Sequence, residues 1–264
     1  DELGEFRNLV AKPNGIILVT GPTGSGKTTT LYSVLMEANT VDTKIITTED
    51  PVEYDLEGIV QVQVNEEIGL TFADCLRSIL RQDPDKILVG EVRDLETAQI
   101  AVESSLTGHI VYSTLHTNDA PSSVTRILDL GLEPFLISAT LEGVIAQRLA
   151  RRICLQCKTP YDPTEQELYE LELTATETQG REFYFGKGCK SCNGTGYKGR
   201  VALFEMMLVN DRLRDMIMNA GSTAELRSAA REDGMRTLRD SGLLQIYDGI
   251  STIEEVVKET ISTV

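Results

Sequence analysis

The chain has 264 residues, of which 41% are hydrophobic and 25% charged, and its formal net charge is −16. This composition excludes an intrinsically disordered chain, because it can bury a sizeable core, and the negative charge argues against direct binding of nucleic acid. No run of about 18 apolar residues occurs, so we predict no membrane insertion. The chain begins with neither Met nor a signal peptide. We therefore expect a fragment of an acidic, soluble, cytoplasmic protein.

Residues 1–150 are predicted to form the first domain, in which short apolar runs alternate with stretches of helical spacing. The runs are continuous and partly β-branched, as in strands of a parallel sheet covered on both faces. The predicted strands are 16–19, 44–47, 87–89 and 110–112, and the predicted helices are 29–38, 72–81 and 95–105. This alternation indicates right-handed βαβ units and an α/β fold.

The sequence changes character after residue 150. Residues 151–200 contain two cysteine pairs on either side of an acidic stretch, 163–177, which is predicted to form one or two exposed helices. We interpret this part as a small zinc-binding subdomain. Residues 201–264 show helical periodicity, with helix-start signals at 221–223 and 248–252, and predict a C-terminal helical region.

A phosphate-binding motif stands between the first predicted strand and helix. It matches G-x-x-x-x-G-K-[ST] in full, and glycines in such a loop let backbone N–H groups surround phosphates. The helix N-terminus adds about half a positive charge. Lys27 is expected to reach the β/γ-phosphates, and Thr28 to offer its hydroxyl to Mg²⁺. The predicted ATP-binding residues are Gly21, Pro22, Thr23, Gly24, Ser25, Gly26, Lys27, Thr28 and Thr29.

Acidic side chains follow two further predicted strands. Glu49 and Glu53 follow the second, and Glu91 follows the third after Gly90. Ligands of open α/β sheets lie at the carboxyl ends of the strands, so these acids are predicted to face the phosphates. Glu91 is predicted to hold Mg²⁺ through a water, and either Glu53 or Glu49 to polarise the attacking water. The alternative is that they are ordinary loop acids.

The chain has two histidines, and both flank the fourth predicted strand. His116 follows the strand, where a sensor of the γ-phosphate belongs, and His109 precedes it; packing or surface roles are the alternative for both. Arg77 and Arg81 lie on one face of a predicted helix and could act on a neighbour's phosphate. Alternatively, they belong to an exposed face paired with nearby acids.

Four cysteines form two C-x-x-C pairs, which suits a structural zinc site better than a disulfide framework. A redox pair is the rival interpretation, but no thioredoxin-like context accompanies the motifs. Cys75 is predicted to be a small buried apolar residue. The predicted zinc ligands are Cys154, Cys157, Cys189 and Cys192.

Four stretches of the chain together resemble one family. Residues 21–28, 48–65, 76–93 and 108–119 are similar, in this order, to the Walker A, Asp-box, Walker B and His-box segments of the secretion-ATPase superfamily. This superfamily contains the motors of type II secretion, type IV pilus assembly and related DNA-uptake machines. The cysteine pairs resemble the tetracysteine element of its assembly branch, which pilus-retraction ATPases lack.

The resemblance implies a homohexameric ring of RecA-like domains that binds ATP and Mg²⁺ between protomers, with Zn²⁺ in the tetracysteine element. By it, Glu53 falls on the Asp-box glutamate that activates water, Glu91 on the Walker B acid, and His116 on the second His-box histidine. It implies a motor that assembles pilin-like subunits, attached to the inner membrane through a platform protein. A P-loop phosphotransferase and a non-hydrolysing nucleotide-gated scaffold are the alternatives, and the motifs do not separate type II secretion from pilus assembly.

Overall fold

The computed structural model describes residues 2–174 and 176–260. The chain folds as two compact units, of which the first comprises Asp1–Thr23, Lys27–Ala146 and Met206–Met235. The second comprises Gly24–Gly26, Gln147–Glu205 and Arg236–Val264. The domain boundaries predicted at residues 150 and 200 stay a prediction, and the residues beyond 200 contribute to both units.

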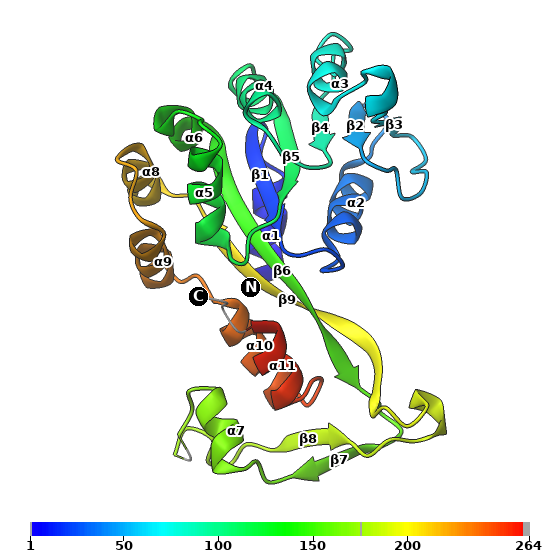
Figure 1. Ribbon diagram of the computed structural model, residues 1–264, viewed down its shortest axis with the longest axis vertical. Helices are drawn as coiled ribbons and strands as arrows, with labels where there is room; N and C mark the ends of the chain where they lie inside the picture. Colours follow the sequence, from blue (N-terminus) through cyan, green and yellow to red (C-terminus); the bar gives the residue numbers. More distant parts are fainter. Residues whose placement is uncertain (1, 175, 261–264) are drawn as a thin grey trace. The chain divides into compact units, whose positions relative to one another are not determined.

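A parallel sheet forms the centre of the first unit (Figure 1). Its order is β3-β2-β4-β5-β1, and it continues through β6 and β9. The four predicted strands are all present, and the expected α/β fold with a mostly parallel sheet is confirmed. The strands are β1 (Gly15–Thr20), β2 (Ile45–Glu49), β3 (Val60–Gln63), β4 (Lys86–Val89), β5 (Ile110–Leu115), β6 (Leu141–Ile153) and β9 (Tyr197–Leu208).

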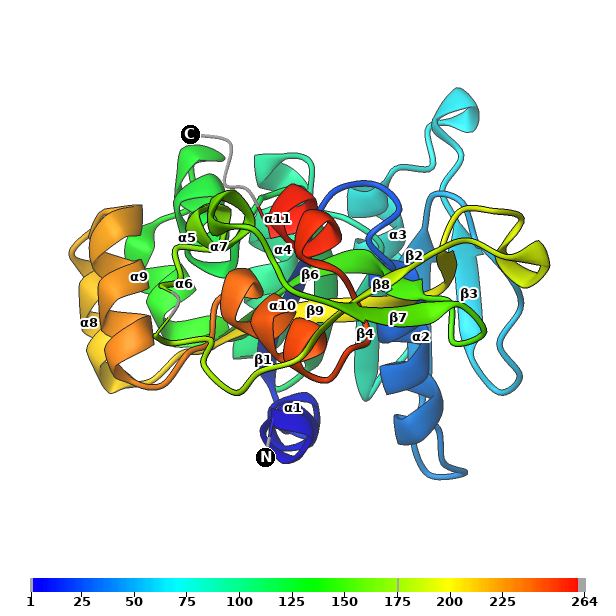
Figure 2. The ribbon, with the colours of Figure 1, turned by 90° about the horizontal axis from the view of Figure 1, so that it is seen from below.

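Helices cover both faces of this sheet, which explains why every residue of β1, β2 and β5 is buried. Figure 2 shows α1 and α2 on one face and α3, α4, α5 and α6 on the other. On β1, Ile17 and Val19 pack in one core cluster with Leu31 and Leu35 of α2. The helices are α1 (Glu2–Val10), α2 (Lys27–Ala38), α3 (Phe72–Ile79), α4 (Leu95–Leu106), α5 (Ala120–Asp129) and α6 (Pro134–Thr140), with a 3₁₀ turn at Glu66–Ile68.

The C-terminal part is only partly helical. Helical structure was expected from residue 201, but β9 extends to Leu208, so this prediction is wrong for its first residues. Leu203, Glu205 and Met207 are buried at every second position, and strand pairing overrides the helix propensity of this stretch. The helices predicted beyond it are confirmed as α8 (Asp211–Met218), α9 (Thr223–Glu232), α10 (Leu238–Tyr247) and α11 (Ile253–Thr260).

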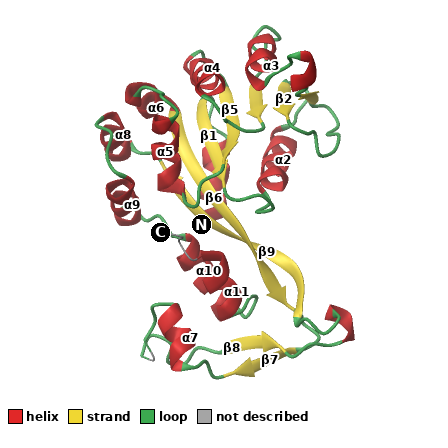
Figure 3. Cartoon of the chain, viewed as in Figure 1, coloured by secondary structure: helices red, strands yellow, loops and turns green. Residues whose placement is uncertain are grey.

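The second unit contains a small hairpin (Figure 3). It also has its own apolar cluster. The acidic stretch supplies a single short helix, α7 (Glu165–Glu170), which Thr164 and Glu167 cap reciprocally; residue 175 of that stretch lies outside the described residues. Strands β7 (Lys158–Tyr161) and β8 (Phe183–Gly186) pair antiparallel, and a 3₁₀ turn spans Lys190–Cys192. Across residues 2–174 and 176–260, no helix is both long and apolar enough to cross a membrane.

Candidate functional site

The loop between β1 and α2 has a backbone suited to holding phosphate. Gly24 and Gly26 have φ angles of 81° and 89°, a region that side chains disfavour. A Cβ at Gly24 would meet no atom within 4 Å, so the space above it is open. The buried Ser25 Oγ has no hydrogen-bond partner among the described residues. These features fit a cradle for phosphate oxygens.

The first turn of α2 adds positive potential beside this loop. No acidic side chain lies in that turn, so the positive end of the helix dipole is not neutralised. Lys27 Nζ donates to the carbonyl oxygen of Gly21 at 2.7 Å and to that of Pro22 at 3.2 Å, so the ammonium folds back over the loop. Thr28 and Thr29 follow on the same turn. The Thr28 hydroxyl has the chemistry to hold Mg²⁺.

Glu91 lies just beyond the carboxyl end of β4 and contacts the side chains of Arg93 and His116. One carboxylate oxygen, Oε1, accepts a hydrogen bond from Arg93, and the other, Oε2, lies 3.3 Å from Nε2 of His116. Hydrogen bonding to Glu91 raises the pKa of Arg93. Gly90 permits this geometry, because a Cβ there would lie 3.2 Å from the carbonyl oxygen of Thr48 on β2.

His116 directly follows β5 at the same edge of the sheet. Thr20 at the end of β1 fixes this segment, since its hydroxyl donates to the Leu115 carbonyl at 3.0 Å and accepts from the Thr117 N–H at 2.9 Å. Parallel strands place Thr20, Glu49, Glu91 and His116 at a common edge. The structure thus brings Glu91 and His116, two of the predicted catalytic residues, into contact, and Lys27 begins α2 after the loop that follows β1 at the same edge.

The two glutamates that follow β2 differ in their environment. Glu49 is 4% exposed, and its carboxylate accepts hydrogen bonds from Tyr32, Thr47 and Gln61. Glu53 lies on the exposed loop that follows, with its side chain free to face solvent. This difference favours Glu53 over Glu49 as the residue that meets a water molecule.

Three other predicted residues, His109, Arg77 and Arg81, have different surroundings. His109 precedes β5, so it lies at the opposite end of that strand, where Nδ1 is 3.0 Å from the Ser104 carbonyl oxygen. Arg77 on α3 pairs with Asp74 at 3.4 Å and with Glu96, as the alternative interpretation expected for an exposed face. Arg81 is also exposed. Their roles in nucleotide binding stay predictions.

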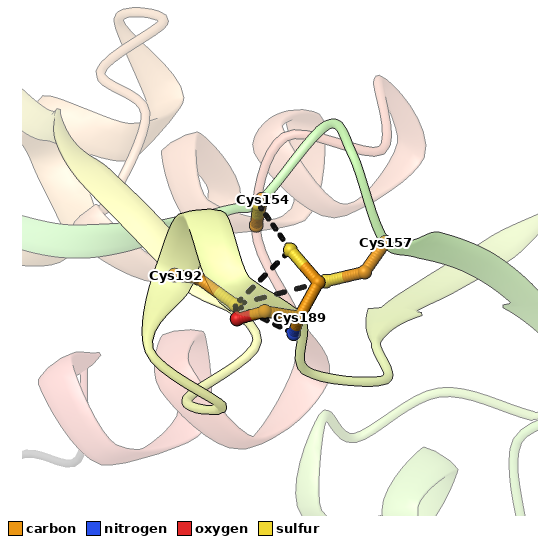
Figure 4. Close-up of side chains that lie close together, drawn as sticks. All are labelled: Cys154, Cys157, Cys189 and Cys192. Carbon is orange, nitrogen blue, oxygen red and sulfur yellow. Dashed lines mark hydrogen bonds between the residues drawn. The ribbon is translucent and has the colours of Figure 1, made fainter.

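The four paired cysteines converge in the second unit (Figure 4). Their sulfur atoms all lie within 4.8 Å of one another. The Sγ–Sγ distance is 3.9 Å for Cys154–Cys189 and for Cys157–Cys192, and 3.7 Å for Cys189–Cys192. Four sulfurs bound tetrahedrally to zinc at about 2.3 Å lie about 3.8 Å apart. The donor set and its spacing therefore fit Zn²⁺.

Backbone N–H groups prepare one of these thiols to be a thiolate. Cys192 Sγ accepts from the N–H of Cys189 at 3.1 Å and from that of Gly196 at 3.3 Å, as the glycine-rich second pair predicts. Burial alone would raise the pKa of Cys192, but these N–H groups outweigh it and lower the pKa to about 6. Thiolates are the form that binds metal.

The sequence pattern of the family described as Type II/IV secretion system protein matches residues 1–258. The chain belongs to this family. The family resemblance predicted from the sequence is thereby confirmed.

The named relatives include ATPases of type IV pilus assembly and of type II secretion. The chain is 52% identical over 259 residues to the type IV pilus assembly ATPase PilB of Myxococcus xanthus, covering 98% of this chain and 46% of that protein. It is 52% identical over 256 residues to PilB of Thermus thermophilus, covering 97% and 29%. It is 49% identical over 257 residues to the type II secretion system ATPase E of Vibrio cholerae, covering 97% and 50%. The chain thus spans half or less of the length of these relatives.

A solved structure of this family has the same fold. The crystal structure of the pilus retraction motor PilT with bound ADP superposes with a TM-score of 0.73 at 30% identity, covering 98% of this chain and 65% of that one. Its likeness supports a P-loop fold for this chain.

Sequence reasoning missed Tyr32, Gln61 and Arg93 as members of the site. Tyr32 is 1% exposed, and a buried tyrosine requires a partner for its hydroxyl, but the sequence does not reveal this burial. Gln61 lies in β3, a strand the sequence analysis did not predict. Arg93 gave no signal apart from its place two residues after Glu91.

Proposed function

We propose that the chain is the ATP-hydrolysing part of a motor that drives assembly of pilin-like subunits, in type IV pilus biogenesis or type II protein secretion. The observation that supports this most directly is that Glu91, His116 and the loop bearing Glu53 follow neighbouring strands at the edge where β1 leads into the P-loop. Identity of about 50% to assembly ATPases of both kinds supports the same conclusion.

Each residue of this edge has a chemical part in the proposed reaction. Lys27 binds the β/γ-phosphates, and Glu53 orients and polarises the attacking water. Thr28 and, through a water, Glu91 hold Mg²⁺, which neutralises phosphate charge when it is bound. His116 lies against Glu91 and senses the γ-phosphate.

The proposed motor works as a homohexameric ring. Nucleotide binds between protomers, and Arg77 and Arg81 reach the phosphates of a neighbour. Arg77 must then exchange Asp74 and Glu96 for phosphate, which its exposed position permits. Ring motion passes to a platform protein of the inner membrane, so that the chain is cytoplasmic and peripheral to that membrane. Zn²⁺ on the four cysteines has a structural role, because four thiolates leave no open position.

Native mass spectrometry of the full-length protein with Mg²⁺ and a slowly hydrolysed ATP analogue tests this proposal. We expect a six-subunit species with one zinc per chain and nucleotide bound. A zinc-loaded monomer that binds nucleotide but never assembles would contradict the ring motor.

A second assay separates the motor from a phosphotransferase. A motor releases phosphate from ATP with water alone, whereas a phosphotransferase needs an acceptor molecule. Phosphate release without any acceptor is expected, and release that depends on an added acceptor would overturn the proposal.

A further inference from the structure

A buried polar cluster lies beneath the loop that carries Glu53. It consists of Tyr32 on α2, Glu49 at the end of β2 and Gln61 on β3, and we call it the Tyr32 cluster. The Tyr32 hydroxyl donates to Glu49 Oε2 and accepts from Gln61 Nε2 at 3.3 Å. Gln61 Nε2 also donates to Glu49 Oε1 at 3.1 Å. Each member therefore contacts both others.

The cluster binds the backbone of the loop at three points. The Glu53 N–H donates to the Tyr32 hydroxyl at 3.3 Å. Gln61 donates to the Tyr54 carbonyl oxygen at 3.2 Å and accepts from the Leu56 N–H at 2.6 Å. Side chains of two other elements thus hold the backbone of Glu53 itself and of two residues that follow it.

The Tyr32 ring adds a packing contact to these hydrogen bonds. It meets the Tyr54 ring edge to face, with centroids 4.8 Å apart and planes at 81°. Burial, followed by the hydrogen bond to Glu49, raises the pKa of Tyr32, so its hydroxyl remains a donor throughout the physiological range. A hydroxyl that stays protonated can donate to Glu49 and still accept from the Glu53 N–H.

We propose that Tyr32, together with Glu49 and Gln61, is a positioning residue that fixes the loop so that the Glu53 carboxylate meets the attacking water. This inference rests on the proposed ATP hydrolysis. It assigns Glu49 a different part from Glu53: its buried carboxylate receives the Tyr32 and Gln61 donors and anchors the loop, whereas the exposed carboxylate of Glu53 performs the chemistry.

The position of Tyr32 on α2 gives the cluster a further consequence. Lys27 and Thr28 lie on the first turn of the same helix, so one rigid element carries the phosphate-binding groups and the support for Glu53. The distance between the phosphates and the water-activating carboxylate is then set by α2. A small misplacement of a catalytic group lowers the rate far more than it lowers binding.

The test is Tyr32→Phe in the full-length protein, because phenylalanine keeps the ring and removes only the hydroxyl. We expect kcat for ATP hydrolysis to fall about tenfold or more, with less than a twofold change in nucleotide affinity. Hydrogen exchange at the Glu53 amide is expected to accelerate, since that N–H loses its acceptor.

Tyr112→Phe is the matched control. Tyr112 on β5 is 0% exposed, and its hydroxyl donates to the Val10 carbonyl oxygen at 2.7 Å, away from the loop. This variant loses a buried tyrosine hydroxyl as well, but we expect its kcat and its Glu53 exchange to stay those of the unsubstituted protein.

Coupling to Glu53 gives an independent readout. If Tyr32 acts through Glu53, adding Tyr32→Phe to Glu53→Gln lowers turnover no further. Turnover of Tyr32→Phe equal to that of Tyr112→Phe, or unchanged exchange at Glu53, would overturn the positioning role. Normal turnover in Glu53→Gln would instead overturn the role of Glu53 in the proposed function, while the exchange measurement still reports whether Tyr32 holds the loop.

Discussion

The nucleotide edge of the first unit and the cysteine cluster of the second are assembled in different ways. At the nucleotide edge, each functional side chain follows a different strand, so the register of the parallel sheet fixes their positions. In the cysteine cluster, two tight turns supply two sulfurs each, and two backbone N–H groups orient the sulfur of Cys192. A site fixed by a sheet is preorganised by the core, whereas a site made of turns depends on its metal for stability.

Removal of the thiolates should produce the largest effect. In Cys154→Ser/Cys189→Ser, we expect the zinc content to fall from one per chain to near zero, with loss of most of the roughly 10 kcal/mol that structural zinc supplies. ATP affinity should change less than threefold, because the nucleotide edge does not use the metal. Elemental analysis and ATP titration measure both quantities.

Cys75→Ala is the control for this prediction, since Cys75 is 2% exposed in the core of the first unit. It should keep its zinc. Retention of one zinc per chain by the double variant would contradict the claim that the cysteine cluster holds a metal on which its stability depends.

Loss of the P-loop ammonium should affect only the nucleotide edge. Lys27→Ala is expected to lower ATP turnover at least about 100-fold, because Lys27 is the P-loop cation that binds the β/γ-phosphates in the proposed site. Phosphate release and zinc content are measured on the same sample. Turnover within threefold of the unsubstituted protein would contradict the assignment of the P-loop.

The smallest effect concerns stability of the second unit. Glu255 is 1% exposed and accepts from the Arg151 backbone N–H at 2.7 Å and from its guanidinium at 2.9 Å. Burial alone would raise the pKa of Glu255, but the bonds from Arg151 outweigh it and hold the pKa below its usual range. A carboxylate with a lowered pKa in the folded state stabilises the fold above its unfolded pKa, and this stabilisation is lost as pH falls through the folded value.

We therefore expect Glu255→Gln to lower the free energy of unfolding by about 1–2 kcal/mol at pH 7. The difference should shrink as the pH falls below about 4. Urea unfolding at both pH values measures it, and the exposed neighbour Glu254→Gln is the control. A destabilisation that is equal at both pH values would show that packing, not charge, explains the effect.

The two regions also differ in how far the sequence predicts them. The P-loop and the cysteine pairs can be predicted from local spacing, because the residues that define each motif are close in sequence. Strands β1, β2, β4 and β5 are predictable because helices cover both faces and leave continuous apolar runs, whereas the partly exposed β3 carries no such run. Strand β9 was not predicted. Its residues beyond 200 include good helix formers, and they pair with β6 only in the folded chain.

The Tyr32 cluster could not be predicted for a related reason. Tyr32, Glu49 and Gln61 come from three elements, and the separation of their side chains depends on how those elements pack. From the pattern of strands and acids alone, Glu49 and Glu53 are equivalent candidates for water activation, and only the family resemblance favours Glu53. Burial of the Glu49 carboxylate, which only the fold reveals, separates them.

The most direct test of the central claim, that Glu53 activates water for ATP hydrolysis, is the turnover and ATP affinity of Glu53→Gln. Glutamine keeps the size of the side chain and removes its charge. We predict ATP binding within threefold of the unsubstituted protein and phosphate release lowered at least about 100-fold. Undiminished phosphate release would contradict the assignment of Glu53 and with it the proposed mechanism.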